Sequence, residues 1–114
     1  MRCTGFPSPA EQYAEKRLDL NALLVRHPSA TIMMRVTGDG WREAGFHAGD
    51  TLIIDRSLRP QEGQFVVAGI EGELKLRRIG RRDGRIVLEP GAEPPAGREI
   101  RLFGVVTWVI HQLG

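Results

Sequence analysis

The chain has 114 residues, of which 41% are hydrophobic and 26% charged, and its formal net charge is only +2. This length and balance are typical of one globular domain, and so small a charge gives no argument for nucleic-acid binding by itself. One cysteine, Cys3, excludes an internal disulfide and a cysteine-rich zinc site. No apolar run approaches the roughly 20 residues that span a bilayer, so we expect a soluble, cytoplasmic protein without membrane contact.

The N-terminal quarter predicts an extended arm followed by short helices. Residues 1–10 hold two prolines and one glycine without periodicity, which is typical of an arm. A short helix is expected near residues 9–16, and a second helical turn follows with Asp19 or Asn21 as its N-cap. The second helix is expected to bury the leucines of one face, which are Leu20, Leu23 and Leu24.

From residue 32 onward the hydrophobic pattern changes from helical to alternating, which predicts strands. The strand-like runs are residues 32–37, 51–55, 64–70, 74–79, 85–88 and 102–110. Asp83-Gly84 predicts a hairpin turn, and Met33 and Met34 are both expected in the core. Residues 11–114 are therefore predicted to form one mainly β domain, compact and curled or barrel-like, behind the arm of residues 1–10.

Several sequence strings follow one another from residue 5 to residue 110. They are G-F-P-S-P-A at 5–10, R-L-D-L-N-A-L-L at 17–24, H-P-S-A-T at 27–31, V-T-G-D at 36–39, G-D-T-L-I-I-D at 49–55, E-G-E-L-K-L-R-R-I at 71–79 and F-G-V-V-T-W-V-I at 103–110. In these strings the chain resembles the UmuD branch of the self-cleaving LexA-like proteins. The resemblance implies a LexA- and signal-peptidase-type β domain that carries a serine–lysine dyad and cuts its own arm when the RecA filament promotes the reaction.

Both positions that carry the dyad in this family hold other residues here. The family's serine motif G-D-S-M reads Gly38-Asp39-Gly40-Trp41, so Gly40 stands at the nucleophile position. Aligned without gaps, the lysine position is Arg77, and arginine keeps its proton at physiological pH and cannot act as a base. Lys75 lies about 6.6 Å further back on the same strand face, too far to replace that base. We therefore expect no catalytic residue.

The remaining candidate residues suggest no replacement site. The other candidate hydroxyl groups lie away from the nucleophile position in the sequence; they are Ser8, Ser29, Thr37 and Ser57. No Ser/His/Asp order indicates another triad. The histidines are widely spaced, match no metal signature and are expected at the surface or in loops; they are His27, His47 and His111. We expect neither a metal nor a cofactor.

The resemblance places the family's cleavable bond between Thr4 and Gly5, where we expect a vestigial site. Family members that cut themselves carry a longer arm, so this chain begins near the start of their processed product. A protein made in processed form needs no protease, and the dyad could then decay. Trp41 beside Gly40 favours natural drift over a designed substitution; this tryptophan is expected either to fill the groove of the lost arm or to cap a turn.

The resemblance implies a non-enzymatic accessory subunit in the SOS DNA-damage response. Its expected partners are a second copy in a homodimer, a UmuC-like Y-family translesion polymerase and the RecA filament, with DNA contacted indirectly through the complex. The apolar residues expected at the dimer interface are Phe103, Val105, Val106 and Trp108. Two alternatives stay open, namely an active self-cleaving serine peptidase with a misassigned site, and an antagonist that forms heterodimers with a host UmuD.

Six cations lie between Lys75 and Arg85 around the expected hairpin turn. They predict either a basic patch for DNA or an acidic partner, or a charged hairpin that keeps a sheet edge soluble. No aromatic residues interleave with them, which argues against a stacking platform for single strands.

Overall fold

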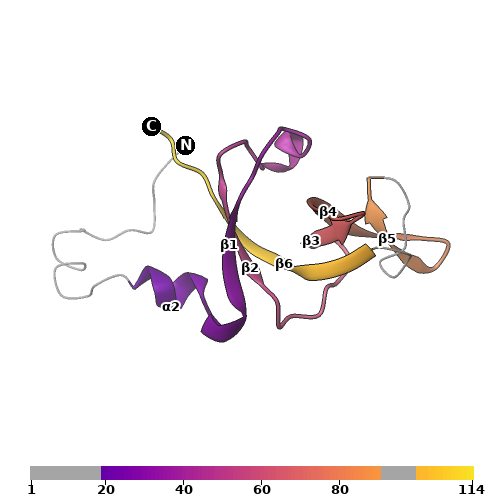
Figure 1. Cartoon of the computed structure of the whole chain (residues 1–114), viewed down its shortest axis with the longest axis horizontal. Coiled ribbons are helices and arrows are strands. Elements are labelled where there is room, and N and C mark those ends of the chain that lie inside the picture. The colour runs from indigo at the N-terminus through magenta and orange to yellow at the C-terminus, as the bar shows by residue number, and fades with distance from the viewer. Residues whose placement is uncertain (1–18, 91–99) are drawn as a thin grey trace, which may run out of the picture.

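The computed structural model describes residues 19–90 and 100–114 (Figure 1). The arm of residues 1–10, the helix expected near 9–16 and the bond between Thr4 and Gly5 lie outside the described residues. The order of elements is a short helix, a 3₁₀ turn, a strand, a second 3₁₀ turn and five further strands. No helix in the two described ranges is long and apolar enough to cross a membrane.

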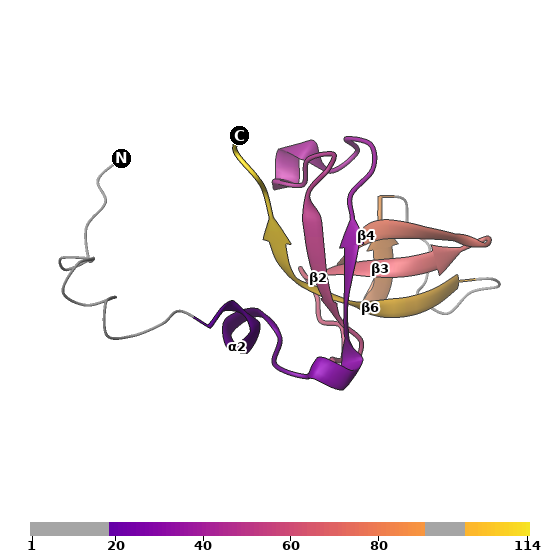
Figure 2. The same cartoon turned by 60° about the vertical axis from the view of Figure 1, so that its left-hand side comes forward.

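Helix α2 (Leu20–Leu24) begins at Asp19, whose side chain accepts a hydrogen bond from the backbone N–H of Ala22 at 3.2 Å. Of the two caps considered, Asp19 is therefore the right one. The predicted burial of this helix is wrong for two of its leucines, because Leu20 and Leu23 are 55% and 46% exposed. The helix stands to one side of the sheet (Figure 2), so no strand of the described chain covers that face.

Six strands form one antiparallel sheet in the order β1-β2-β6-β3-β4-β5. They are β1 (Thr31–Arg35), β2 (Thr51–Asp55), β3 (Phe65–Ile70), β4 (Glu73–Arg82), β5 (Arg85–Glu89) and β6 (Ile100–Ile110). The last strand thus enters the middle of the sheet, between β2 and β3 (Figure 1). The predicted mainly β fold is confirmed; the sheet is curled, with β1 and β5 at its two edges.

The hairpin between β4 and β5 follows directly from its turn residues. Arg82 pairs with Arg85, which leaves a two-residue turn of Asp83 and Gly84. These two residues have φ values of 53° and 76°, the positive values that a type I′ turn requires. Asparagine, aspartate and glycine adopt such values at low cost, so the predicted turn is confirmed.

The core consists of two apolar clusters that share the central strands. Val66 and Ala68 of β3 belong to the first cluster, whereas Val67 belongs to the second. Because side chains alternate along a strand, the two clusters lie on opposite faces of β3. At the edge, Met34 packs against the second cluster, but Met33 is 70% exposed, so its predicted burial is wrong. Along the edge strand β1, therefore, the face that carries Met33 is left uncovered among the described residues.

Candidate functional site

A groove of about 850 Å³ lies between the loop that follows β1 and the strand β4. Gly40 lines it from the loop, and Lys75 and Arg77 line it from the strand. Apolar side chains, among them Leu52 and Val67, complete its lining. The fold therefore brings together the two positions that the family resemblance pairs as nucleophile and base.

Gly40, which the family resemblance places at the nucleophile position, has open space around it. A Cβ atom built on Gly40 would have no heavy atom within 4 Å, and the backbone of Gly40 is outside the left-handed region. By contrast, Gly38 has a φ of 76°, which favours glycine. A serine at residue 40 would therefore fit the local backbone.

Arg77 places a donor-only group on the opposite side of the groove. Its side chain is half-buried, and Nη1 donates a hydrogen bond to the carbonyl oxygen of Leu76 at 3.0 Å. Its Nε is buried without a hydrogen-bond partner among the described residues. A guanidinium has five N–H donors and no acceptor, so it cannot take a proton from a hydroxyl group.

Lys75, the other basic residue of β4 that lines the groove, lies beside a carboxylate. Its Nζ lies 3.5 Å from a carboxylate oxygen of Glu73, and its side chain is 41% exposed. The lysine of a serine–lysine dyad has to be neutral, which requires burial away from compensating carboxylates. The side chain of Lys75 is instead partly exposed and lies beside Glu73.

Trp41 fixes the loop that carries Gly40 onto the strand that carries Arg77. Its Nε1 donates a hydrogen bond to the carbonyl oxygen of Leu76 at 2.8 Å, and its ring meets Phe65 edge-on with 5.0 Å between ring centroids. Its own carbonyl oxygen accepts the N–H of Ala44 and so closes the 3₁₀ turn Arg42–Ala44. Trp41 therefore lines the groove and, through its backbone carbonyl oxygen, caps the 3₁₀ turn, which is one of the two roles considered for it.

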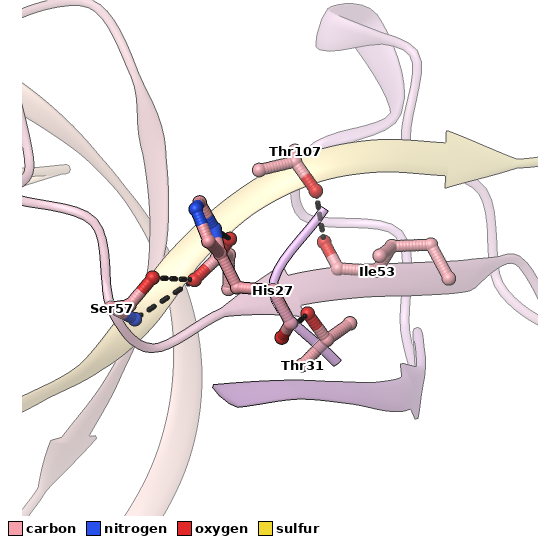
Figure 3. Close-up of polar contacts among 6 residues, drawn as sticks. His27, Thr31, Ile53, Ser57 and Thr107 are labelled. Carbon is pink, nitrogen blue, oxygen red and sulfur yellow. Dashed lines mark hydrogen bonds and ion pairs between the residues drawn. The ribbon is translucent and has the colours of Figure 1, made fainter. Parts of the chain in front are cut away.

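A second polar cluster contains a serine, a histidine and an aspartate in contact (Figure 3). Asp55 is 4% exposed; one of its oxygens accepts the Ser57 hydroxyl at 2.5 Å, and the other lies 2.6 Å from Nδ1 of His27. The carboxylate thus stands between the hydroxyl and the imidazole, whereas a catalytic triad needs the imidazole in the middle. This cluster joins the segment before β1 to the end of β2 and has no hydrolytic geometry.

The hydrogen bonds in this cluster also set the charge of Asp55. Those from the Ser57 hydroxyl, His27 and the backbone N–H of Ser57 hold the pKa of Asp55 below its ordinary value of 3.8, although burial opposes the shift. Asp55 is therefore an ionised, structurally bonded carboxylate.

The other two histidines meet at a second buried aspartate. His47 and His111 both face Asp50, which is 2% exposed. Their spacing in the sequence gave no indication of this, since the pairing of β2 with β6 brings residue 111 beside residue 50. The side chains of His47 and His111 are half-exposed, in agreement with the surface or loop position expected for them, and the fold brings the two together.

Of the residues expected at a dimer interface, one is buried in the core and the others are exposed to different degrees. Val105 is 1% exposed and belongs to the first core cluster, so its assignment to an interface is wrong. Phe103 and Val106 are half-buried against the second cluster, whereas Trp108 is 42% exposed. Residues 105–110 of β6 pair with β2 and residues 100–105 pair with β3, so among the described residues each half of this strand is paired along one edge.

The cations of the β4–β5 hairpin are partly neutralised by nearby carboxylates. Arg78 lies 3.1 Å from Glu89, and Arg81 lies 3.0 Å from Glu62. These ion pairs, with that of Lys75, reduce the net positive charge of the hairpin. They favour the interpretation of a charged, soluble edge over that of a nucleic-acid patch.

The antiparallel, curled sheet and its groove fit the peptidase-type β domain that the family resemblance implies. The chain belongs to the family described as Peptidase S24-like, which matches residues 2–106. The UmuD-like and LexA-like resemblance of its sequence strings is thereby confirmed.

Named relatives match almost the whole chain. Protein ImpA of Salmonella typhimurium is 44% identical over 117 residues, which cover 97% of this chain and 80% of that protein. Protein SamA of Salmonella typhimurium strain LT2 is 40% identical over 114 residues, covering 97% of this chain and 81% of SamA. Protein MucA of Escherichia coli is 37% identical over 109 residues, covering 90% and 75%.

Proposed function

We propose that this chain is a catalytically inactive, UmuD-like accessory subunit of an error-prone translesion polymerase in the SOS response. One observation carries the proposal: the groove of this peptidase-family fold presents Gly40 and Arg77 where a nucleophile and a base would be needed. Each substitution removes a different requirement of the reaction, so the loss of activity does not depend on either one alone.

The rest of the groove supports a retained binding role. The Trp41 indole and the Arg77 guanidinium both bond the carbonyl oxygen of Leu76, so the wall beside the vestigial dyad is held in place without a substrate. A groove that keeps its shape and loses its chemistry suits a subunit that contacts a partner segment. The family resemblance gives the expected partners, which are a second copy, a UmuC-like Y-family polymerase and the RecA filament in the cytoplasm.

The alternative of an active serine peptidase with another site gains no support from the described residues. Ser57 is the serine that lies with a histidine and an aspartate, and its hydroxyl donates to Asp55 instead of His27. Burying a hydroxyl proton against a carboxylate makes Ser57 a poor nucleophile in this geometry.

Incubation of the purified full chain at alkaline pH tests the inactivity. Alkaline conditions help a serine–lysine dyad because they deprotonate the lysine, so they are the most favourable conditions for residual activity. We expect intact mass spectrometry to find no truncation over days, with or without the RecA filament. A discrete N-terminal product that forms at a rate independent of added protease inhibitors would contradict the proposal.

Binding experiments distinguish the accessory role from the antagonist role. The chain should co-purify with a UmuC-like polymerase in a complex that lacks any other UmuD-like protein. If it binds the polymerase only weakly but forms heterodimers with a self-cleaving UmuD in preference to homodimers, the antagonist interpretation is the better one.

A further inference from the structure

None of the residues that line the groove belongs to the cluster of His47, Asp50 and His111. Asp50 immediately precedes β2, and His111 immediately follows β6. Because Thr51 pairs with Ile110 in an antiparallel register, the next two residues, Asp50 and His111, face each other. His47 reaches the same place through the tight turn that ends at Asp50.

That turn holds the Asp50 carboxylate rigidly. One carboxylate oxygen accepts the backbone N–H of His47 at 2.8 Å, while the backbone N–H of Asp50 donates to the carbonyl oxygen of His47 at 3.0 Å. The Asp50 carbonyl oxygen in turn accepts the N–H of Val36 at 2.8 Å. The carboxylate is thus buried and fixed before any ligand arrives, which lowers the entropy cost of binding one.

The two imidazoles approach the carboxylate from different chain segments. Nδ1 of His111 lies 2.5 Å from one oxygen of Asp50, and Nδ1 of His47 lies 3.7 Å from the other. The two imidazole rings are 4.8 Å apart between centroids. One ligand atom from each of the three residues lies within 4.8 Å of the others.

The burial of Nδ1 of His47 is not explained by contacts within the part of the chain that the structure describes. This atom is buried and has no hydrogen-bond partner among the described residues. Buried ring nitrogens are ordinarily bonded, because leaving one unbonded costs free energy. A ligand shared with Asp50 and His111 would satisfy this nitrogen.

We propose that His47, Asp50 and His111 form a three-ligand site for a divalent transition-metal ion, with Zn²⁺ as the best match. Imidazole nitrogen and carboxylate oxygen are ligands that zinc accepts, at about 2.0–2.2 Å in a tetrahedral arrangement. Such bonds place ligand atoms roughly 3.4 Å apart, so the side chains need shifts on the order of 1 Å. The half-exposed imidazoles leave the fourth position to water.

Metal binding would replace the hydrogen bond between His111 and Asp50. Nδ1 of a neutral His111 would pass its proton to Nε2 and bind the ion with its lone pair. The ion would then join His111, which follows β6, to Asp50 and His47 in the turn before β2 through three ligand bonds, where one hydrogen bond stands now. Without a metal, the hydrogen bond between His111 and Asp50 fixes the C-terminal end of β6. An experiment therefore has to distinguish this structural role from metal binding.

Isothermal titration of the untagged full chain with Zn²⁺, and with Mg²⁺ as a control ion, tests the proposal. The Cys3→Ser background removes the single thiol, which could bind zinc by itself. His47→Gln is the informative variant, because the Nδ1 atom that it removes makes no hydrogen bond among the described residues and the His111–Asp50 bond stays in place. His27→Gln is the matched control, since it also removes a half-exposed imidazole beside a buried aspartate.

We expect saturable binding of one Zn²⁺ per chain, no binding of Mg²⁺ under the same conditions, and a rise of the melting temperature with zinc. His47→Gln and His111→Gln should each weaken zinc binding by at least about tenfold, whereas His27→Gln should change it less than about twofold. Failure to bind zinc at millimolar concentration would overturn the proposal. Equal affinity in the wild type and His47→Gln would overturn it as well.

Discussion

Gly104 is the position of β6 where an added methyl group is expected to be tolerated least. A Cβ atom there would lie 2.6 Å from Cγ2 of Ile54 and 3.2 Å from the carbonyl oxygen of Asp55. Ile54 is completely buried, and a backbone oxygen cannot rotate away, so neither neighbour can move without disturbing the core. Overpacking of this kind costs about 1–3 kcal/mol of unfolding free energy.

For a domain of this size, Gly104→Ala should therefore lower the melting temperature by roughly 4–12 °C. Gly69→Ala in β3 is the matched control, because its Cβ would find the nearest atoms at 3.8 and 3.9 Å, which is ordinary contact. Replacing glycine by alanine lowers the conformational entropy of the unfolded chain, so Gly69→Ala should leave the unfolding free energy unchanged or raise it by about 0.4–1 kcal/mol.

The assay is thermal unfolding followed by circular dichroism, with all three proteins at one concentration so that any association affects them equally. If Gly104→Ala melts at the same temperature as Gly69→Ala, then the close packing of β6 against β2 described here is wrong.

Three further changes test other parts of the structure. Asp55→Asn should be less stable than the wild type above about pH 4. The difference should shrink as the pH falls through the lowered pKa of Asp55, because a carboxyl group with a pKa below 3.8 stabilises the fold only while it is ionised. A difference in unfolding free energy that stays constant over this pH range would be inconsistent with that role. Trp108→Glu should shift a homodimer toward monomer with little change in melting temperature, whereas Val109→Glu, on the other face of β6, should leave the association unchanged. Sedimentation at several concentrations measures the association. A wild-type chain that stays monomeric at tens of micromolar argues against the dimer. Trp41→Phe should cost about 0.5–1.5 kcal/mol in urea unfolding because it removes the hydrogen bond to Leu76, and an unchanged midpoint would mean that this bond does not hold the loop.

Local patterns predicted the features that depend on local chemistry. The Asp83-Gly84 turn required only residues that adopt positive φ values, and the alternating runs identified the strands because alternation is a property of each strand by itself. The groove could be predicted only through the family resemblance. That resemblance supplied the pairing of Gly40 with Arg77, which no spacing in this sequence implies.

Features that depend on the sheet order could not be predicted. Val105 was taken as an interface residue because its strand is long and apolar, but β6 enters the centre of the sheet and buries it. The same pairing of β2 with β6 brings His111 to Asp50, across a separation that gives no periodic signal. For α2, periodicity identified the apolar face, but it carries no information on whether another element covers that face.

The loss of the dyad is tested most directly by cleavage of a UmuD-type arm peptide at alkaline pH, measured by mass spectrometry. Four proteins are compared: the wild type, Gly40→Ser, Arg77→Lys and the double variant. Open space at residue 40 lets the serine fit, and a lysine at residue 77 would restore a group that can lose its proton. We predict that only the double variant yields product, whereas cleavage by the wild type, or by Gly40→Ser at the rate of the double variant, would contradict the account.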